Sequence, residues 1–333
     1  MNLAWVGPSC RSAQILGLRS NAARPQVGPW PRFTSKFWRR SRPRNRSGGA
    51  GRAATEVRPE LASQREALHL GCTVCFLLAL GLCAPIQATE KIDEDLLKRY
   101  EARTFREASS NPLLYRFFKP PQYRSTNHYP LVLILHGAVG RGADNQKQFA
   151  GGNRVPPAAF AEAQNQATHP CFVVVPQCPV NDHWGSGVFG KPTETTRSTL
   201  ALLDALPKEF SIDRARLYLV GLSMGGGGAW DLLSRHPRLF AAAVPICGAG
   251  DPAKAGLLTQ IPIWCFHGDK DPLINVEYAR RMMAAIRGAG GHPRYTEYPG
   301  VGHNSYVKAF EEPELLPWLF SQKRGSPSGL SGR

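Results

Sequence analysis

The order of apolar and polar positions after Thr89 predicts strands and helices in alternation. Short, continuous apolar runs are typical of strands that are buried on both faces, as in a parallel sheet. Between these runs, apolar residues recur at steps of three and four, which indicates helices packed against the sheet. The predicted strands span 131–135, 172–175, 217–220, 241–246, 261–266 and 294–298, and the clearest helices span 195–210 (with apolar residues at Leu200, Leu203, Leu206 and Phe210), 276–287 and 306–320, the last despite Pro313 and Pro317.

Two further strands precede this series. Residues 100–107 and 113–119 are β-prone and are separated by Ala-Ser-Ser-Asn-Pro, which predicts an antiparallel hairpin at one edge of the sheet. The whole pattern, without an internal repeat or linker, indicates one α/β domain with a mostly parallel sheet over residues 89–323. Residues 324–333 are polar and rich in Gly and Ser, so we expect a loose tail.

The charge of the chain is concentrated near its start. Of 41 Lys and Arg residues thirteen precede Ala67, but only three of 25 Asp and Glu residues do, and the formal net charge of the chain is +16. The basic residues stand among Pro, Ser and Gly without a periodic apolar partner, which is typical of disorder rather than of nucleic-acid binding. We therefore expect residues 1–67 to be disordered, and one interpretation of so long a leader is that translation starts further along the chain.

Residues 68–88 form an apolar run that ends in small residues. This is the pattern of a secretory signal peptide. A retained membrane anchor is the alternative, but the run is short for a hydrocarbon core of about 30 Å and contains Pro85. The sequence thus predicts a secreted or periplasmic protein without stable membrane insertion after cleavage, with anchoring at the cell surface as the alternative.

Four of the eight cysteines follow this segment: Cys171, Cys178, Cys247 and Cys265. None has the spacing of metal ligands, so no metal site is predicted. Export would permit one or two disulfides in any of three pairings. The alternative is that each is a small buried side chain at a strand end.

The clearest chemical motif of the chain directly follows the predicted strand at 217–220. Its sequence, Gly-Leu-Ser-Met-Gly over residues 221–225, is GxSxG between a strand and a helical stretch, which is the setting of a nucleophile elbow. A serine hydroxyl is a weak nucleophile and must project from a sharp turn toward a base, which requires very small residues two positions to either side. We predict that Ser223 is a nucleophile; the alternative is a serine that only caps a helix.

The acid and the base of a catalytic triad would follow later strands, in the order Ser, Asp, His. The strand at 261–266 is followed by Asp269 and Asp271, and the last strand is followed by His303. Because the carboxyl ends of parallel strands meet at one edge of a sheet, we predict His303 as the base and Asp271 as the acid that orients it. Asp269 and Asp251 remain alternative acids.

Two backbone N–H groups are needed to stabilise the oxyanion of a tetrahedral intermediate. Met224, directly after the nucleophile, would supply one. The Gly-rich segment 136–145 follows a predicted strand and can turn an amide inward, and Ala138 is the predicted second donor. A simple strand-to-helix turn is the alternative for this loop. His136 and His267 are interpreted as structural hydrogen-bonding residues.

Several segments carry a family resemblance: His-Gly-Ala with Arg-Gly-Ala-Asp-Asn, Val-Val-Pro-Gln-Cys-Pro, Gly-Leu-Ser-Met-Gly-Gly, Pro-Ile-Cys-Gly-Ala-Gly-Asp and His-Gly-Asp-Lys-Asp. They resemble secreted carboxylesterases of the α/β-hydrolase superfamily, in the phospholipase/carboxylesterase and polyhydroxybutyrate-depolymerase-like group, which includes feruloyl esterases and proteins labelled predicted peptidases. The resemblance covers residues 95–323 and implies the same triad, with Gln177 and Trp184 near the substrate pocket. Residues 139–140 depart from the Gly-Glu that related sequences often carry. Dienelactone hydrolases share the fold but use a cysteine nucleophile, so Ser223 speaks against that branch.

Motifs and resemblance together predict a serine esterase that works through an acyl-enzyme, without metal or organic cofactor. Only residues 248–260 separate two core strands where many relatives insert a cap domain, which predicts an open site without a cap. Such a site suits a bulky or polymer-borne ester, for example acyl or feruloyl groups on polysaccharides or polyesters. The alternatives are a serine peptidase of the prolyl-oligopeptidase-like type and a non-enzymatic surface binding protein on the same fold.

Overall fold

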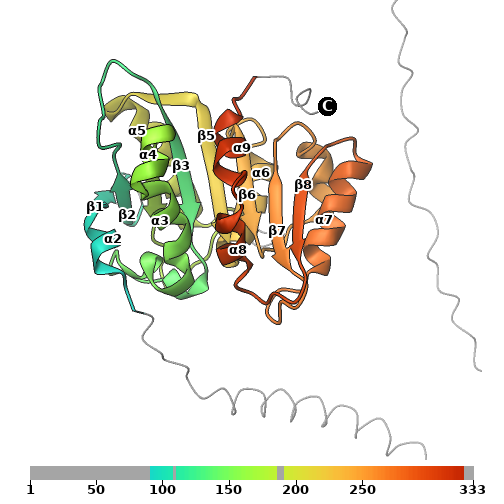
Figure 1. Ribbon diagram of the computed structural model, residues 1–333. Coiled ribbons are helices and arrows are strands. Elements are labelled where there is room, and N and C mark those ends of the chain that lie inside the picture. Colours follow the sequence, from blue (N-terminus) through green and yellow to red (C-terminus); the bar gives the residue numbers. More distant parts are fainter. Residues whose placement is uncertain (1–90, 108–109, 186–190, 326–333) are drawn as a thin grey trace, which may run out of the picture. The chain divides into compact units, whose positions relative to one another are not determined.

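The computed structural model describes residues 91–107, 110–185 and 191–325 (Figure 1). The expected leader, the expected signal segment and most of the expected tail lie outside these residues. Within the described residues, no helix combines the length and the apolar composition that a membrane span requires.

Eight strands form one sheet in the order β1-β2-β4-β3-β5-β6-β7-β8 (Figure 1). The strand pairs from β4 to β8 are parallel, whereas β2 is antiparallel to both β1 and β4. The predicted fold class, a mostly parallel α/β sheet with an N-terminal hairpin, is confirmed. The strands are β1 (Glu101–Phe105), β2 (Leu113–Phe118), β3 (Tyr129–Leu135), β4 (Phe172–Pro176), β5 (Ile212–Leu222), β6 (Ala242–Ile246), β7 (Trp264–Gly268) and β8 (Arg294–Tyr298).

Helices cover both faces of the sheet, which explains the continuous apolar runs. Within β3, Leu131 and Leu133 pack in the core on one face, while Val132 and Ile134 pack in the core on the other. Successive side chains of a strand point to opposite faces, so a strand covered on both sides must be apolar throughout. The first face carries α5 (Glu194–Glu209), α6 (Met224–Arg235) and α7 (Glu277–Gly288), and the second carries α2 (Glu94–Lys98), α3 (Val155–Ala161), α4 (Ala163–Thr168), α8 (Ser305–Glu311) and α9 (Leu315–Ser321).

The predicted closing helix is two helices. Pro313 has no N–H to donate and disfavours a helical conformation in the residue before it, so α8 ends at Glu311 and α9 begins at Leu315. Pro317 is tolerated because it lies in the first turn of α9, where N–H groups have no partner within the helix. The prediction of one continuous helix over 306–320 is therefore wrong.

Two strands differ in extent from the prediction. β5 begins five residues earlier than predicted, because its polar first half extends beyond the core while still pairing with β3 at Tyr129. β7 begins after Pro262 and runs through His267, which the sequence pattern placed beyond the strand. Between β6 and β7 the chain forms only a short 3-10 helix, η4 (Pro252–Leu257), so the expected absence of a cap at this point is confirmed.

The four cysteines of the described domain are all buried and free. The disulfide interpretation is therefore wrong for the described residues, and the small buried side chain is the correct alternative.

Candidate active site

Ser223 occupies the turn between β5 and α6, in a backbone conformation that residues other than glycine rarely adopt. Its φ is 56° and its ψ is −118°. Its N–H donates to the carbonyl of Ile246 on β6 at 2.9 Å, which holds the turn against the neighbouring strand. A strained residue of this kind persists only where the surrounding structure fixes it.

The glycines of the GxSxG motif are required by close backbone contacts. A Cβ on Gly221 would lie 2.1 Å from the carbonyl oxygen of Gly225, and a Cβ on Gly225 would lie 2.0 Å from that of Leu135. Both distances are far inside van der Waals contact, so only glycine permits α6 to start this close to β3 and β5. The turn that exposes Ser223 thus follows from local sterics.

Ser223, His303 and Asp271 come from three separate loops and form a chain of hydrogen bonds. His303 Nδ1 lies 2.8 Å from Asp271 Oδ2, and His303 Nε2 lies 2.8 Å from Ser223 Oγ. An ionised carboxylate only accepts hydrogen bonds, so Nδ1 carries the proton and Nε2 accepts from the serine hydroxyl. The side chain of Asp271 is fully buried, while that of His303 is 21% exposed.

The environment of Asp271 keeps it ionised. Burial alone raises the pKa of this carboxyl, but the N–H of Ile274, the imidazole of His303 and the N–H of Leu273 outweigh burial and lower the pKa below its usual value. The two backbone N–H groups both donate to Oδ1 at 2.9 Å, which leaves Oδ2 for His303.

The two alternative acids have other partners. Asp269 accepts from the N–H of Gly300 at 2.6 Å and so ties the loop after β7 to the loop that carries His303. Asp251 accepts from the N–H of Ala253 at 3.0 Å at the start of η4. Of the three aspartates, only Asp271 makes a hydrogen bond to His303 in the structure.

Sequence reasoning missed that His267 contacts the same carboxylate. His267 Nε2 donates to the carbonyl of Ile274 at 2.8 Å and lies 3.2 Å from Asp271 Oδ2. Its side chain is fully buried, which agrees with the expected structural role. β7 begins three residues later and ends two residues later than predicted, so His267 lies within the strand, and no motif signals this.

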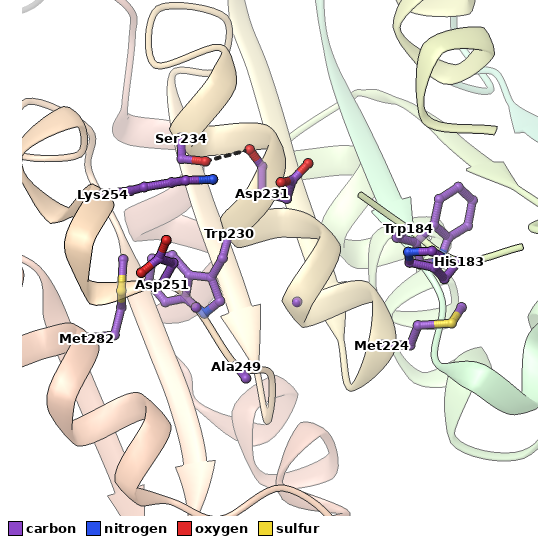
Figure 2. Close-up of a pocket in the computed structure, with 12 residues that line it drawn as sticks. His183, Trp184, Met224, Trp230, Asp231, Ser234, Ala249, Asp251, Lys254 and Met282 are labelled. Carbon is purple, nitrogen blue, oxygen red and sulfur yellow. Dashed lines mark hydrogen bonds between the residues drawn. The ribbon is translucent and has the colours of Figure 1, made fainter. Parts of the chain in front are cut away.

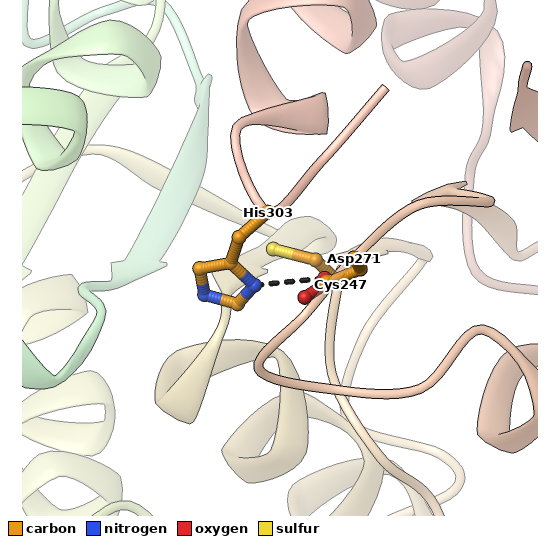
Figure 3. Close-up of side chains that lie close together, drawn as sticks. All are labelled: Cys247, Asp271 and His303. Atoms are coloured by element: carbon orange, nitrogen blue, oxygen red, sulfur yellow. Dashed lines mark hydrogen bonds and ion pairs between the residues drawn. The ribbon is translucent and has the colours of Figure 1, made fainter. Parts of the chain in front are cut away.

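Cys247 also lies beside Asp271 and His303 (Figure 3), and its φ is 41°. One ligand atom each from Cys247, Asp271 and His303 lie within 4.8 Å of one another, which is close enough to suggest a cation site. However, a cation would have to break the hydrogen bond between His303 and Asp271. Burial raises the pKa of the Cys247 thiol to about 12, so this sulfur stays protonated near pH 7 and is a poor nucleophile.

The loop after β3 lies directly against Ser223. A Cβ built on Gly137 would lie 3.4 Å from Ser223 Cβ, and the Gly137 N–H donates to Asn153 Oδ1 at 2.8 Å. Ala138 begins the 3-10 helix η1 (Ala138–Gly140), and Met224 begins α6. The first N–H groups of a helix have no partner within it. Both expected oxyanion donors therefore start helices on either side of Ser223.

His136 supports this loop from below, as expected. Its Nδ1–H donates to the carbonyl of Gly137 at 2.7 Å, and its Nε2 accepts from the N–H of Cys178 at 3.0 Å. Complete burial lowers the pKa of His136 to about 4, so the ring is neutral near pH 7 and can serve as donor and acceptor at once.

Gln177 makes all of its side-chain hydrogen bonds to the same loop. Its Oε1 accepts from the N–H of Asn145 at 2.6 Å, and its Nε2 donates to Asp144 Oδ1 at 2.8 Å and to the carbonyl of Gly140 at 3.3 Å. The side chain also borders a polar hollow with residues of α5. Direct contact of Gln177 with a substrate stays a prediction, while its contacts with the loop are evident.

Trp184 lies between the loop after β3 and α6. Its Nε1 donates to the carbonyl of His136 at 2.9 Å, and α6 approaches it closely at Gly228, where a Cβ would lie 2.2 Å from Trp184 Cβ. With α6 it borders a hollow of about 210 Å³ that we call the α6 groove (Figure 2). The groove is lined by His183, Trp184, Met224, Gly227, Trp230, Asp231, Ser234, Ala249, Gly250, Asp251, Lys254 and Met282.

Comparison with known proteins agrees with this geometry. The model of the Dienelactone hydrolase family matches residues 184–313, a region that contains all three residues of the hydrogen-bonded chain. A thermostable esterase of known structure is 37% identical, with a TM-score of 0.66 over 69% of this chain and 64% of that one. The chain has the α/β-hydrolase fold. The interpretation from the sequence that Ser223 speaks against the dienelactone hydrolase branch is not supported, because the model of that family matches the region that contains Ser223.

Curated relatives match over shorter parts. A bifunctional acetylxylan esterase/xylanase of Neocallimastix patriciarum is 31% identical over 95 residues, which are 28% of this chain and 14% of the relative. Poly(3-hydroxyalkanoate) depolymerase C of Paucimonas lemoignei is 26% identical over 189 residues, which are 54% of this chain and 42% of the relative. The chain thus spans less than half the length of either relative.

Proposed function

We propose that this hydrolase cleaves carboxylic esters through a covalent acyl-enzyme, with Ser223 as the nucleophile, His303 as the general base and Asp271 as the residue that orients His303. The observation that carries the proposal is the pair of 2.8 Å hydrogen bonds that link the three side chains, with Ser223 on a strained turn. The esterase names of two of the similar proteins support the same class of reaction.

In the first half of the reaction, His303 Nε2 takes the hydroxyl proton while Ser223 Oγ attacks the ester carbonyl. Negative charge develops on the carbonyl oxygen, and the N–H groups of Met224 and Ala138 are the proposed donors to it. Asp271 stabilises the imidazolium that forms. His303 then gives its proton to the departing alcohol oxygen, and the acyl group remains on Ser223.

In the second half, water replaces the alcohol. His303 removes a proton from the water, which attacks the acyl-enzyme carbonyl, and the carboxylic acid leaves as the proton returns to Ser223. This reaction requires no group beyond the chain and water. Because no cap domain is inserted between β6 and β7, we propose that the site also accepts esters carried on a polymer.

The proposal is tested with Ser223→Ala and 4-nitrophenyl acetate. We expect kcat/KM to fall by at least about four orders of magnitude, since loss of the nucleophile leaves only binding and oxyanion stabilisation. A fluorophosphonate probe should label the wild-type protein and not the variant. The exposed Ser321→Ala is the matched control and should retain both activities. Retained turnover in Ser223→Ala, with an unchanged thermal unfolding midpoint, would contradict the proposal.

The same assays separate the alternative functions. A surface binding protein on this fold would neither react with the probe nor turn over esters. A peptidase would react with the probe, but would cleave peptide anilides at a higher kcat/KM than matched esters.

We propose further that the protein is exported, on the basis of the apolar pattern at residues 68–88. N-terminal sequencing of the mature protein is expected to find a start close to residue 89. A mature protein that begins before Leu68 would contradict both export by this segment and the later start of translation.

A further inference from the structure

The α6 groove includes in its lining the residue that follows the proposed nucleophile. Met224, directly after Ser223, lines it beside Trp184, and Trp230 lines it further along α6 (Figure 2). Among the described residues that line it, none comes from the loops after β7 and β8 that carry Asp271 and His303. The lining of the groove therefore includes Met224, which carries one proposed oxyanion donor, but not Ser223 itself.

This position decides which part of an ester the groove can receive. The tetrahedral carbon bears the oxyanion, the departing alcohol and the acyl substituent. The oxyanion must point at the N–H of Met224, and the alcohol oxygen must lie within reach of His303 Nε2, which protonates it. The acyl substituent is the group that remains, and the groove is the hollow that begins beside Met224 without passing His303.

The size and the lining of the groove indicate the chemistry of that group. Part of the lining is apolar, with contributions from Met224, Trp184, Trp230 and Met282, and the rest includes polar and charged residues such as Asp251 and Lys254. An apolar cavity of about 150 Å³ holds a benzene molecule. The volume of the α6 groove is about 210 Å³, so it is suited to a medium-length alkyl chain or a single ring.

We propose that the α6 groove binds the acyl chain of the substrate and that Gly227 determines how long this chain can be. The proposal rests on the esterase function proposed above and names the substrate class of the same site: esters whose acyl group is apolar and longer than acetyl. One helical turn rises about 5.4 Å, and Gly227 lies four residues after Ser223. An acetyl group ends before Gly227, whereas an octanoyl or 3-phenylpropanoyl group passes it.

Gly227 has no structural need to be a glycine, unlike its neighbours in the helix. A Cβ built on Gly227 would make one ordinary contact, at 3.6 Å from the carbonyl oxygen of Ala249. On Gly226 the same atom would lie 2.6 Å from the carbonyl oxygen of Ile246. Glycine inside a helix costs about 1 kcal/mol relative to alanine. A glycine that packing does not require, at a position that lines the groove, keeps the groove open.

The test is a series of 4-nitrophenyl esters with a constant leaving group and acetyl, butanoyl, octanoyl and 3-phenylpropanoyl acyl groups. For the wild-type protein we expect kcat/KM to rise from acetyl to the two longer groups. In Gly227→Leu the side chain would fill the groove, and the ratio of kcat/KM for octanoate to that for acetate should fall at least about tenfold. The smaller Gly227→Ala should lower the ratio less.

The matched control is Gly288→Leu. Gly288 is also helical, at the end of α7, and a Cβ there would meet nothing within 4 Å. We expect the control to leave the ratio of octanoate to acetate turnover unchanged. Thermal unfolding of all variants checks the fold, and Gly227→Ala should not lower the midpoint.

Three results would overturn the inference in different ways. An unchanged ratio in Gly227→Leu would show that the acyl chain does not occupy the α6 groove. If Gly227→Leu lost activity toward acetate esters of longer alcohols but kept the acyl preference of the wild type, the alcohol and not the acyl chain would occupy the α6 groove. A wild-type protein that turns over none of these esters and does not react with a fluorophosphonate would overturn the proposed function itself.

Discussion

The side of the site toward His303 and the α6 groove differ in how many hydrogen bonds they contain and in how closely their atoms are packed. Toward His303, hydrogen bonds of 2.8 Å join the side chains, and both oxygens of Asp271 have donors. Along the α6 groove, Gly227 has free space beside it, and the buried Nε1 of Trp230 has no hydrogen-bond partner among the described residues. Directional bonds fix the geometry of the first side, whereas the second side can be reshaped by substitution without breaking such bonds. We expect the first to control the rate of reaction and the second to control the choice of substrate.

The largest effect on kcat should come from a substitution of Asp271, the proposed acid on the side toward His303. Asp271→Asn keeps the shape of the side chain but favours the wrong tautomer of His303, and we expect kcat to fall about 10⁴-fold. Asp269→Asn is the matched control two residues earlier. Its amide oxygen can still accept from Gly300, so kcat should change by no more than about twofold. Equal losses in the two variants, measured with 4-nitrophenyl acetate, would contradict the assignment of Asp271.

The next largest effect should be a difference in the free energy of unfolding between alanine substitutions of two glycines of α6. Gly225→Ala forces a Cβ against the carbonyl of Leu135, and we expect it to lower the free energy of unfolding by about 3 kcal/mol. Gly227→Ala should instead raise it by up to about 1 kcal/mol, because alanine is the better helix former and has room. Urea denaturation of both variants measures the difference. Similar stability of the two would mean that the start of α6 is less tightly packed than the contacts indicate.

The smallest expected effect is a pH dependence of the free energy of unfolding caused by His136, which supports the loop after β3. Its pKa is lowered by burial from about 6.5 to about 4, so the unfolded chain binds a proton more readily than the folded one in this interval. Stability should therefore fall as the pH drops, by about 2 kcal/mol between pH 6.5 and pH 4.5 from this residue alone.

The measurement is urea denaturation at several pH values for the wild-type protein and His136→Gln. The variant keeps a hydrogen-bonding side chain but cannot titrate. We expect it to be less stable at pH 7 and to lose less stability than the wild type as the pH falls. Parallel losses in the two proteins would mean that His136 is not the group responsible.

The strands and the elbow were predictable because their causes are local. Burial on both faces requires continuous apolar runs, and the steric conflict at the turn requires glycines two residues from Ser223. The same reasoning failed at Pro313, where one residue without an N–H divides the closing helix. It also missed the early start of β5, whose polar half pairs with β3 outside the apolar core.

By itself, the sequence determined the order of the strands and helices along the chain, the position of the turn at Ser223 and the two loops that carry the proposed acid and base. These depend on residues that are neighbours along the chain. Only the tertiary structure decided that Asp271 rather than Asp269 meets His303, that Gln177 bonds to the loop after β3, and that a groove opens beside Gly227. Those outcomes depend on which groups from distant segments come close together. A hydrogen bond forms only when its donor and acceptor lie within about 3 Å of each other, and the order of residues along the chain does not fix such distances.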